Sequence, residues 1–580
     1  LRLNYDLSSL LTKGLSVHGS IAYDSYYYSR KKYSKTFPYY LARRDAEDPD
    51  YIYLIPQSEE SIWSVSTGWD KNRKVYMEFG IDYNRTFGLH KTTALILYNQ
   101  SKYYSPSLQY YVPNAYQGLV GRLTYEYASR YLAEFNMGYN GTENFAKGKR
   151  FGFFPAVSLG WVISEEKFFP KNNIVKYLKV RGSYGEVGND QIGGDRFLYL
   201  PSSYGAASDS GVNKYNFGLA SNPYTSLMIV ENKIGNPDLT WEKAKKMNVG
   251  VDLNLFNNCL TASFDIFKEK RNNILANRST SPMIIGANLP AYNFGEMENR
   301  GWEMDLNFRH HIQDFHYWAR FNYSFARNEI IYMDEVQKRY DYQMTTGRRK
   351  NQFFGLIFDG YYNSWEEINA LDRPKSSWSG NQLQPGDVKY VDVNRDGVID
   401  DYDMVPIGYT PVPEIIYGFS FGAQYKGFDF SILFQGADNV SIKYFGRSMW
   451  PFAKGEESAK SLIKERWTQE RYEAGEKITF PRLSLNPNGE TDHNYRPSTL
   501  WIRDASYLRL KNLEVGYTFT GGFVKRLNLN SVRLYFNGSN LFTWTDVVDL
   551  DPEAPSRSGN VEINTYPLQK VYNIGLNINF

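Results

Sequence analysis

The sequence predicts an all-β protein, a large antiparallel transmembrane β-barrel with long extracellular loops. At the C-terminus, Asn or Gly alternates with the apolar side chains of Tyr572, Ile574, Leu576, Ile578 and Phe580. The composition is 17% aromatic, yet the mean hydropathy is only −0.53. The same alternation recurs along the chain. A strand with one apolar and one polar face, and no helix to cover the apolar face, is typical of a wall between lipid and a wet lumen.

The alternation predicts strands throughout residues 1–580. In chain order, clear cases are 75–83, 119–127, 131–139, 247–255, 260–266, 302–308 and 315–325. Short turns near 129–130 and at 257–258 join neighbours into hairpins, and about eighteen strands of roughly ten residues are expected. In the segment 247–255, Val251 faces lipid and Gly250 faces the lumen. An Arg is therefore expected to be better tolerated at Gly250 than at Val251.

Three long segments are rich in Gly, Pro, Asn, Asp and Ser: 189–240, 329–412 and 438–500. A compact soluble domain does not carry structureless loops of this length, whereas outer-membrane barrels have short periplasmic turns and long external loops. We therefore place these segments outside the cell. A short helix is expected at 456–472, because Ala459, Leu462, Ile463 and Trp467 follow helical spacing.

Several function classes are excluded or disfavoured. A net charge of +3 is too small to argue for nucleic acid, and the single Cys259 excludes a disulfide framework. No apolar run approaches the ~18 residues that a membrane helix needs. The segment 418–422 formally matches the G-x-S-x-G nucleophile elbow, but it lies inside a predicted strand rather than a strand-to-helix turn. The six histidines form no H-x-x-x-H pair, so no catalytic residue is expected and the chain is not expected to be an enzyme.

The segment 392–403 matches a calcium-binding loop of the EF-hand type. Asp392, Asn394 and Asp396 would supply side-chain oxygens, Val398 its carbonyl, Asp400 a ligand through water, and Asp403 the closing carboxylate. Gly397 permits the sharp turn. We therefore expect a structural Ca²⁺ in an extracellular loop over 380–412. The alternative is an ion-free surface turn rich in Asp, Asn and Gly.

Several longer blocks point to a family. They are RLTYEY at 122–127, RYLAEFN at 130–136, NGTENF at 140–145, GFFPAVSLGW at 152–161, LKVRGSYG at 178–185, DASYLRLKNL at 504–513 and NGSNLF at 537–542. This set, in this order, resembles the SusC/RagA-like branch of TonB-dependent outer-membrane transporters. The resemblance covers about residues 115–580.

The resemblance implies a multi-pass protein in the outer membrane of a Gram-negative bacterium, with a 22-stranded barrel and a plugged lumen. It implies a SusD-like surface lipoprotein as cap, TonB as energy source, and the C-terminal aromatic strand (Tyr572, Ile574, Leu576, Ile578, Phe580) as assembly signal. The chain departs from the family at its start, where no TonB box or plug is recognisable. We therefore expect residues 1–580 to be the C-terminal barrel portion of a longer polypeptide. The alternative is a barrel that natively lacks its plug.

Two functions from different classes follow. The first is active import of a large solute, such as an oligosaccharide or oligopeptide, through the barrel and beneath the lipoprotein lid. The second is a structural or assembly scaffold that holds several envelope proteins through its external loops. External aromatic residues at Tyr110, Tyr111, Tyr116, Trp365 and Trp378 are candidates for stacking on sugar rings, although the aromatic girdles at a membrane interface demand the same residue types.

Overall fold

The structure is a computed structural model of the chain. It describes residues 1–580 except 46, 49, 109–110, 192–195, 202–204, 207–213, 220–223, 231–233, 281–288, 379–382, 445–449, 453–460, 485–491, 549, 554–559 and 562–567.

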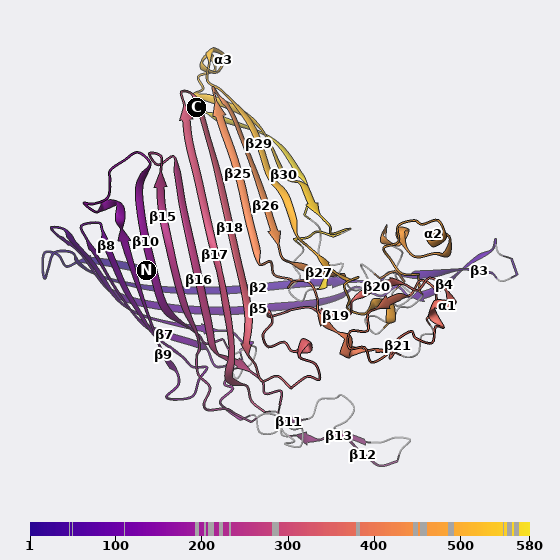
Figure 1. The fold of residues 1–580 in the computed structure, drawn as a ribbon. Coiled ribbons are helices and arrows are strands. Elements are labelled where there is room, and N and C mark those ends of the chain that lie inside the picture. The colour runs from indigo at the N-terminus through magenta and orange to yellow at the C-terminus, as the bar shows by residue number, and fades with distance from the viewer. Residues whose placement is uncertain are drawn as a thin grey trace.

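In the described residues, the main element is one antiparallel sheet of 17 strands in which each strand pairs with the next strand of that sheet along the chain (Figure 1). This agrees with the predicted fold class and with the expected count of about eighteen. The strands are β1 (Arg2–Asp6), β2 (Leu15–Ser34), β5 (Ser64–Phe87), β6 (His90–Tyr104), β7 (Asn114–Tyr127), β8 (Tyr131–Thr142), β9 (Phe151–Val162), β10 (Val175–Asn189), β15 (Glu242–Leu255), β16 (Leu260–Ala276), β17 (Tyr292–Ile312), β18 (Phe315–Tyr332), β25 (Ile415–Tyr425), β26 (Phe428–Asp438), β29 (Tyr507–Phe519), β30 (Ser531–Thr545) and β32 (Val571–Asn579).

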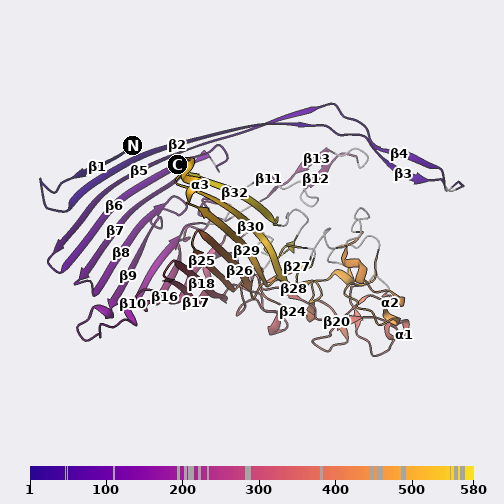
Figure 2. The same ribbon diagram turned by 90° about the horizontal axis from the view of Figure 1, so that it is seen from above.

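The register places the alternating side chains on two faces of a curved wall, which Figure 2 shows from above. Val251 pairs with Val180 and Phe264 on the outward face. Gly250 pairs with Arg181 and Asp265 on the inward face. Because a strand alternates its faces with period two, the whole wall sorts in the same way. Among the described residues, β1 pairs only with β2, and β32 only with β30.

Short turns and long connections lie at opposite ends of the sheet (Figure 1). Ala128 and Ser129 form the tight turn between β7 and β8, both at positive φ. A short helix, α3 (Gly522–Arg526), occupies the turn between β29 and β30. No helix in the described part of the chain is long and apolar enough to cross a bilayer.

The connections β18–β25 and β26–β29 are not structureless. Together with residues after β30 they form a loop module with its own hydrophobic core, which corrects the expectation of unstructured external loops. Its core contains Leu356, Tyr361, Val388, Tyr390, Ile399, Val440, Ile442, Tyr444, Trp450, Trp467, Phe480, Tyr495, Leu500, Trp501, Ala505 and Val547. The physical reason is that scattered Trp, Tyr and Leu from segments far apart in sequence bury one another, which no local periodicity reveals.

Short elements frame this loop module. They are the pairs β19 (Phe354–Gly355) with β24 (Val405–Pro406), β20 (Phe358–Tyr361) with β22 (Val388–Tyr390), and β21 (Lys375–Ser376) with β23 (Val398–Ile399). A small sheet joins β27 (Ser441–Tyr444) to β28 (Ile502–Asp504) and β31 (Asn560–Val561), and the helices are α1 (Trp365–Ile368) and α2 (Gln469–Glu473). In the connection between β10 and β15, β11 (Gly205–Ala206) pairs with β14 (Ile229–Val230), and β12 (Lys214–Phe217) with β13 (Tyr224–Leu227).

The helix expected at 456–472 is wrong in extent. Residues 453–460 lie outside the described part, and the rest forms a 3₁₀ turn at Ser461–Glu465 and then α2. Between them, Arg466 forms a β-bridge with Phe480, and the backbone N–H of Trp467 donates to the Phe480 carbonyl at 2.8 Å. A tertiary strand pairing therefore interrupts the helix.

The hairpin of β2 and β5 runs on past the rest of the sheet as a long arm (Figures 1 and 2). Its tip is a smaller hairpin of β3 (Tyr39–Arg44) and β4 (Ile52–Ser58). Side chains on both faces of the arm are mostly exposed.

Candidate functional site

The inward face of the sheet is the first candidate site, because its polar and charged side chains are arranged as cross-strand networks. The densest network surrounds Arg181 on β10. Its Nη1 lies 2.6 Å from Asp265 Oδ1 on β16, and its Nε lies 3.1 Å from Asp252 Oδ2 on β15. Ser263 Oγ donates to Asp252 at 3.1 Å. One guanidinium thus bridges two carboxylates from neighbouring strands in bidentate fashion.

Gly250 makes this network possible. A Cβ at Gly250 would lie 2.6 Å from both Arg181 Nη1 and Asp265 Oδ1, closer than real contacts allow. Both atoms are the far ends of flexible side chains that form one ion pair, so a side chain at position 250 would have to displace that pair. The structure confirms that Gly250 faces the lumen, and the expectation that an Arg is better tolerated at Gly250 than at Val251 stays a prediction.

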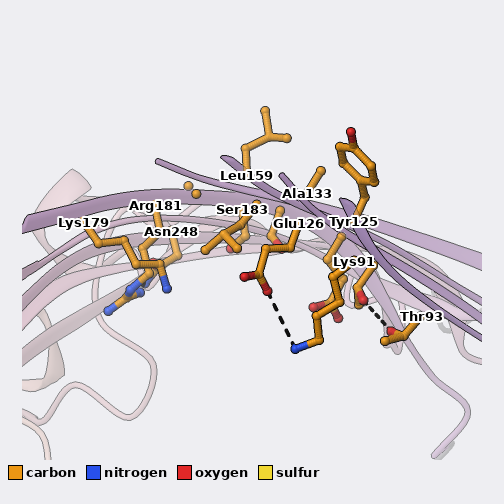
Figure 3. A pocket seen from close by; sticks show the side chains of 16 residues that line it. Lys91, Thr93, Tyr125, Glu126, Ala133, Leu159, Lys179, Arg181, Ser183 and Asn248 are labelled. Atoms are coloured by element: carbon orange, nitrogen blue, oxygen red, sulfur yellow. Dashed lines mark hydrogen bonds and ion pairs between the residues drawn. The ribbon is translucent and has the colours of Figure 1, made fainter. Parts of the chain in front are cut away.

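A hollow of ≈ 430 Å³ lies beside this network, between β6 and β15 (Figure 3). Lys91, Glu126, Lys179 and Arg181 reach into it from one side of the sheet. Lys91 Nζ lies 3.8 Å from Glu126. Figure 3 shows Tyr125 pointing to the opposite side, as the alternation requires. The hollow is therefore a feature of the polar face alone.

A second network lies further along the same face, near the C-terminal strands. Arg533 on β30 donates from Nε to Asp429 on β26 at 2.9 Å and from Nη2 to Glu514 on β29 at 2.6 Å. These charged residues were not among the functional residues predicted from the sequence. The sequence does contain a pattern that could have indicated them, because Arg, Asp and Glu occupy inward positions of adjacent alternating segments. Sequence alone does not give the register that brings them together.

The predicted calcium loop forms a compact turn against the loop module. Asp392 accepts backbone N–H groups of Arg395 at 2.6 Å and of Gly397 at 2.8 Å. Asn394 accepts from Asp396 at 3.0 Å. Gly397 adopts φ +81°, as the sharp turn requires. The structure therefore brings the first half of the predicted ligand set together in one turn.

The second half of the loop folds back over the first. Val398 belongs to β23, and Asp400 accepts the backbone N–H of Tyr402 at 2.7 Å. Asp403 is fully buried, and its carboxylate accepts from the amides of Val393 at 2.8 Å and Asp400 at 2.9 Å. Burial raises the pKa of Asp403 above its ordinary value.

Within the described residues, no group of three or more Asp, Glu, His or Cys side chains is arranged to hold a metal ion. In this arrangement the carboxylates satisfy backbone amides instead. Calcium at this loop stays a prediction.

The strand predicted as the assembly signal is β32. It pairs with β30, so that Ile574 lies opposite Phe536 and Leu576 opposite Leu534 on the outward face. Ile574 is 81% exposed and Phe580 86% exposed. The apolar row of Tyr572, Ile574, Leu576, Ile578 and Phe580 is therefore available for contact with lipid or with an assembly factor.

The aromatic residues considered for sugar stacking do not form one surface. Tyr111 is 81% exposed and Trp365 is 53% exposed. Trp378 packs against the loop-module core, with the Arg496 guanidinium 4.1 Å from its ring centre. Tyr116 sits on the inward face of β7, and Tyr110 lies outside the described residues.

A family model described as "TonB dependent receptor-like, beta-barrel" matches residues 1–541. The chain belongs to this family. It is 28% identical to TonB-dependent receptor P3 of Formosa agariphila over 479 residues, which is 79% of this chain and 45% of that protein. It is 28% identical to TonB-dependent receptor SusC of Bacteroides thetaiotaomicron, over 81% of this chain and 44% of that protein. The chain thus spans less than half the length of these relatives.

Solved structures agree with this assignment. The RagAB peptide importer in its closed-closed state superposes with a TM-score of 0.72 at 20% identity, over 98% of this chain and 60% of that chain. The identity to SusC confirms the resemblance to the SusC/RagA-like branch, and the RagAB superposition shows the shared fold. Members of this family are outer-membrane β-barrels, which places this TonB-dependent receptor barrel in the outer membrane. Its relatives are named as receptors rather than enzymes, in agreement with the expectation that it is not an enzyme.

Proposed function

We propose that this chain forms the wall of an active importer for a large solute, such as an oligosaccharide or oligopeptide. In this proposal a SusD-like surface lipoprotein supplies the lid and TonB supplies the energy. The observation that carries it is the inward face, where the networks around Arg181 and Arg533 make a polar, water-compatible wall. The loop module adds a rigid surface at the end of the sheet that bears the long connections (Figure 1).

The proposal is supported by what the relatives are called. One curated relative is SusC, and the RagAB structures are titled as a peptide importer or transporter. The lipoprotein partner and the solute class are carried over from that likeness. We propose coupling to TonB on the basis of the same likeness.

A paired substitution on β10 tests import. Ser183 faces inward and lines the hollow, whereas Val180 faces outward. In the full-length protein, Ser183→Trp should slow the uptake of the transported solute at unchanged outer-membrane levels. Val180→Trp, in which an aromatic replaces an apolar side chain facing lipid, should leave uptake unchanged. The readout is depletion of a mixture of oligosaccharides and oligopeptides from the medium, followed by mass spectrometry, with a gene deletion as reference.

The alternative function, a scaffold, predicts a different outcome. If the deletion strain depletes every solute as fast as the parent, import is refuted. A pulldown under native detergent then separates the two roles. A single surface lipoprotein agrees with import, and several unrelated envelope proteins agree with a scaffold.

We also propose that Ca²⁺ stiffens the loop 392–403. Its support is the fit of Asp392, Asn394, Asp396, Val398, Asp400 and Asp403 to the twelve-residue spacing, together with the sharp turn at Gly397.

Limited proteolysis with and without chelator tests the calcium proposal. The double variant Asp392→Ala, Asp396→Ala should expose 380–412 to cleavage while the sheet stays folded. The control Asp359→Ala, Asp372→Ala removes two exposed acids of the same module outside the loop. A cleavage rate that changes neither with the chelator nor with the substitutions of Asp392 and Asp396 would favour an ion-free turn.

A further inference from the structure

The outward face of the sheet carries a row of large apolar side chains near the end that bears the long connections. The register aligns Phe79, Tyr98, Leu119, Tyr139 and Phe153 across β5 to β9. Aromatic girdles of this kind mark where the apolar band of a barrel meets the polar interface. The row therefore sets a reference height on this side of the membrane.

Four exposed cations stand beyond this row: Lys71, Arg73, Lys102 and Arg150, which we call the outer cationic patch. Lys102 shares the outward face of β6 with Tyr98 and lies four residues further along. At ~3.3 Å per residue and a strand tilt of ~40°, this is about 10 Å of height, within the headgroup layer. Arg73 is its diagonal neighbour, because Val75 pairs with Lys102 and Arg73 with Tyr104.

Lys102 and Arg150 also line one cavity of ≈ 240 Å³ between β6 and β9. Arg150 is anchored there, since its Nε donates to the Phe145 carbonyl at 3.1 Å. Glu143 is the acidic residue that lines this cavity, and its carboxylate already has partners. It accepts the backbone N–H of Ala115 at 2.9 Å and forms an ion pair with Arg196 at 2.5 Å.

The four cations have no carboxylate of their own. Among the described positions, the outward faces of β2, β5, β6 and β7 hold no Asp or Glu beyond the aromatic row. In the part of the chain that the structure describes, none of the four forms an ion pair within 4.0 Å. Positive charge without a carboxylate partner at this height favours the binding of an anion.

The opposite sector of the same face provides the contrast. There the outward cations are paired: Lys268 lies 2.8 Å from Glu298, and Lys270 lies 2.9 Å from Glu296. Lys243 lies 3.4 Å from Glu186. Among the described residues, outward cations are therefore paired with Glu on β15 to β17, whereas on β5 and β6 Lys102 has no carboxylate within 4.0 Å, and Arg73 and Lys71 lie over the rings of Tyr104 and Trp69.

We propose that the outer cationic patch binds the phosphate group of an acylated glycolipid in the outer leaflet. The phosphate fits the cavity beside Lys102 and Arg150, and Arg73 and then Lys71 follow further along β5, above the cavity. The acyl chains then lie against the apolar row at Phe79 and Tyr98, directly below. The cations therefore lie at the height of the lipid headgroup, and the apolar row lies at the height of the acyl chains.

The test compares a patch variant with a matched control in the purified full-length protein. The patch variant is Lys102→Gln, Arg150→Gln, and the control is Lys268→Gln, Lys270→Gln, which removes cations already paired with Glu. Native mass spectrometry counts bound bisphosphorylated lipid A, with fully dephosphorylated lipid A as a second probe. Each lost cation should weaken binding about fivefold, hence about 25-fold for the pair, with no change in the control. Heat-modifiable mobility on gels verifies that each variant is folded.

The inference is overturned by any of three results. The first is equal retention of bisphosphorylated lipid A by the patch variant and the parent. The second is retention of the dephosphorylated lipid as strong as that of the phosphorylated one, which would mean that the acyl chains alone bind. The third is displacement by inorganic phosphate at the same concentration as the lipid, which would mean a site for a free anion.

Discussion

Replacing Val251 by Arg tests directly which face of the sheet meets lipid. Val251 lies on the outward face between Val180 and Phe264. It is six residues from Lys245, where the polar end of β15 begins, and six residues from the turn at Asn257. Six residues span ~20 Å along the strand, or ~15 Å of height at a tilt of ~40°. This is half of the ~30 Å hydrocarbon thickness, so Val251 sits near the midplane.

An Arg at the midplane of a barrel's lipid face costs ~2–4 kcal/mol, or about 30- to 1000-fold in the folding equilibrium. The matched control is Asn254→Arg, which places the same side chain on the inward face of the same strand, opposite Tyr177 and Thr261. The assay is urea unfolding in phospholipid vesicles, followed by heat-modifiable mobility on gels. Losses of equal size at Val251 and Asn254 would refute the assignment of faces.

Four further outcomes are expected. Phe580→Ser should lower the amount of protein inserted in the outer membrane, and normal levels would remove the C-terminal strand as assembly signal. Gly250→Arg should cost more stability than Asn254→Arg, because the Arg181–Asp265 ion pair must rearrange, but less than Val251→Arg; a loss as large as that at Val251 would argue against this. Burial raises the pKa of Asp403. The calcium-free loop should therefore be most stable below pH ~4 and become more sensitive to protease as the pH rises through the raised pKa of Asp403. Asp403→Asn should abolish this trend. Trp501→Ala should destabilise the loop module by ~3–5 kcal/mol, seen as proteolysis at 353–412 and 440–505 with the sheet intact.

Much of the fold could be predicted from the sequence, because the local alternation of apolar and polar residues shows which face of a membrane strand meets lipid and which meets water. The alternation at 302–308 and 315–325 predicted two strands that pair with each other, and the structure supplies their register, with Trp302 opposite Phe325 and Met304 opposite Tyr323. The segment around Ser420 was predicted to be a strand, and it is β25. Such patterns need no long-range information, since lipid and water act on each side chain separately.

The candidate sites were only partly predictable. The twelve-residue spacing of 392–403 predicted a turn, and the structure has one. The direction of the Asp403 carboxylate depended on how the second half of the loop folds over the first. The ion pairs of Arg181 and Arg533 depended on register between strands up to 104 residues apart in sequence.

The sequence by itself thus determined the two-faced wall and its family, because both are encoded in local alternation and in contiguous motifs. Only the tertiary structure decided the rest. It collected Leu356, Tyr444 and Trp501 into one loop module, interrupted the helix by a strand pairing at Arg466, and placed the Arg181–Asp265 ion pair over Gly250. It also left the outward cations at Lys102 and Arg73 unpaired while pairing Lys268. The physical reason is that burial and charge compensation depend on which segments become neighbours in space.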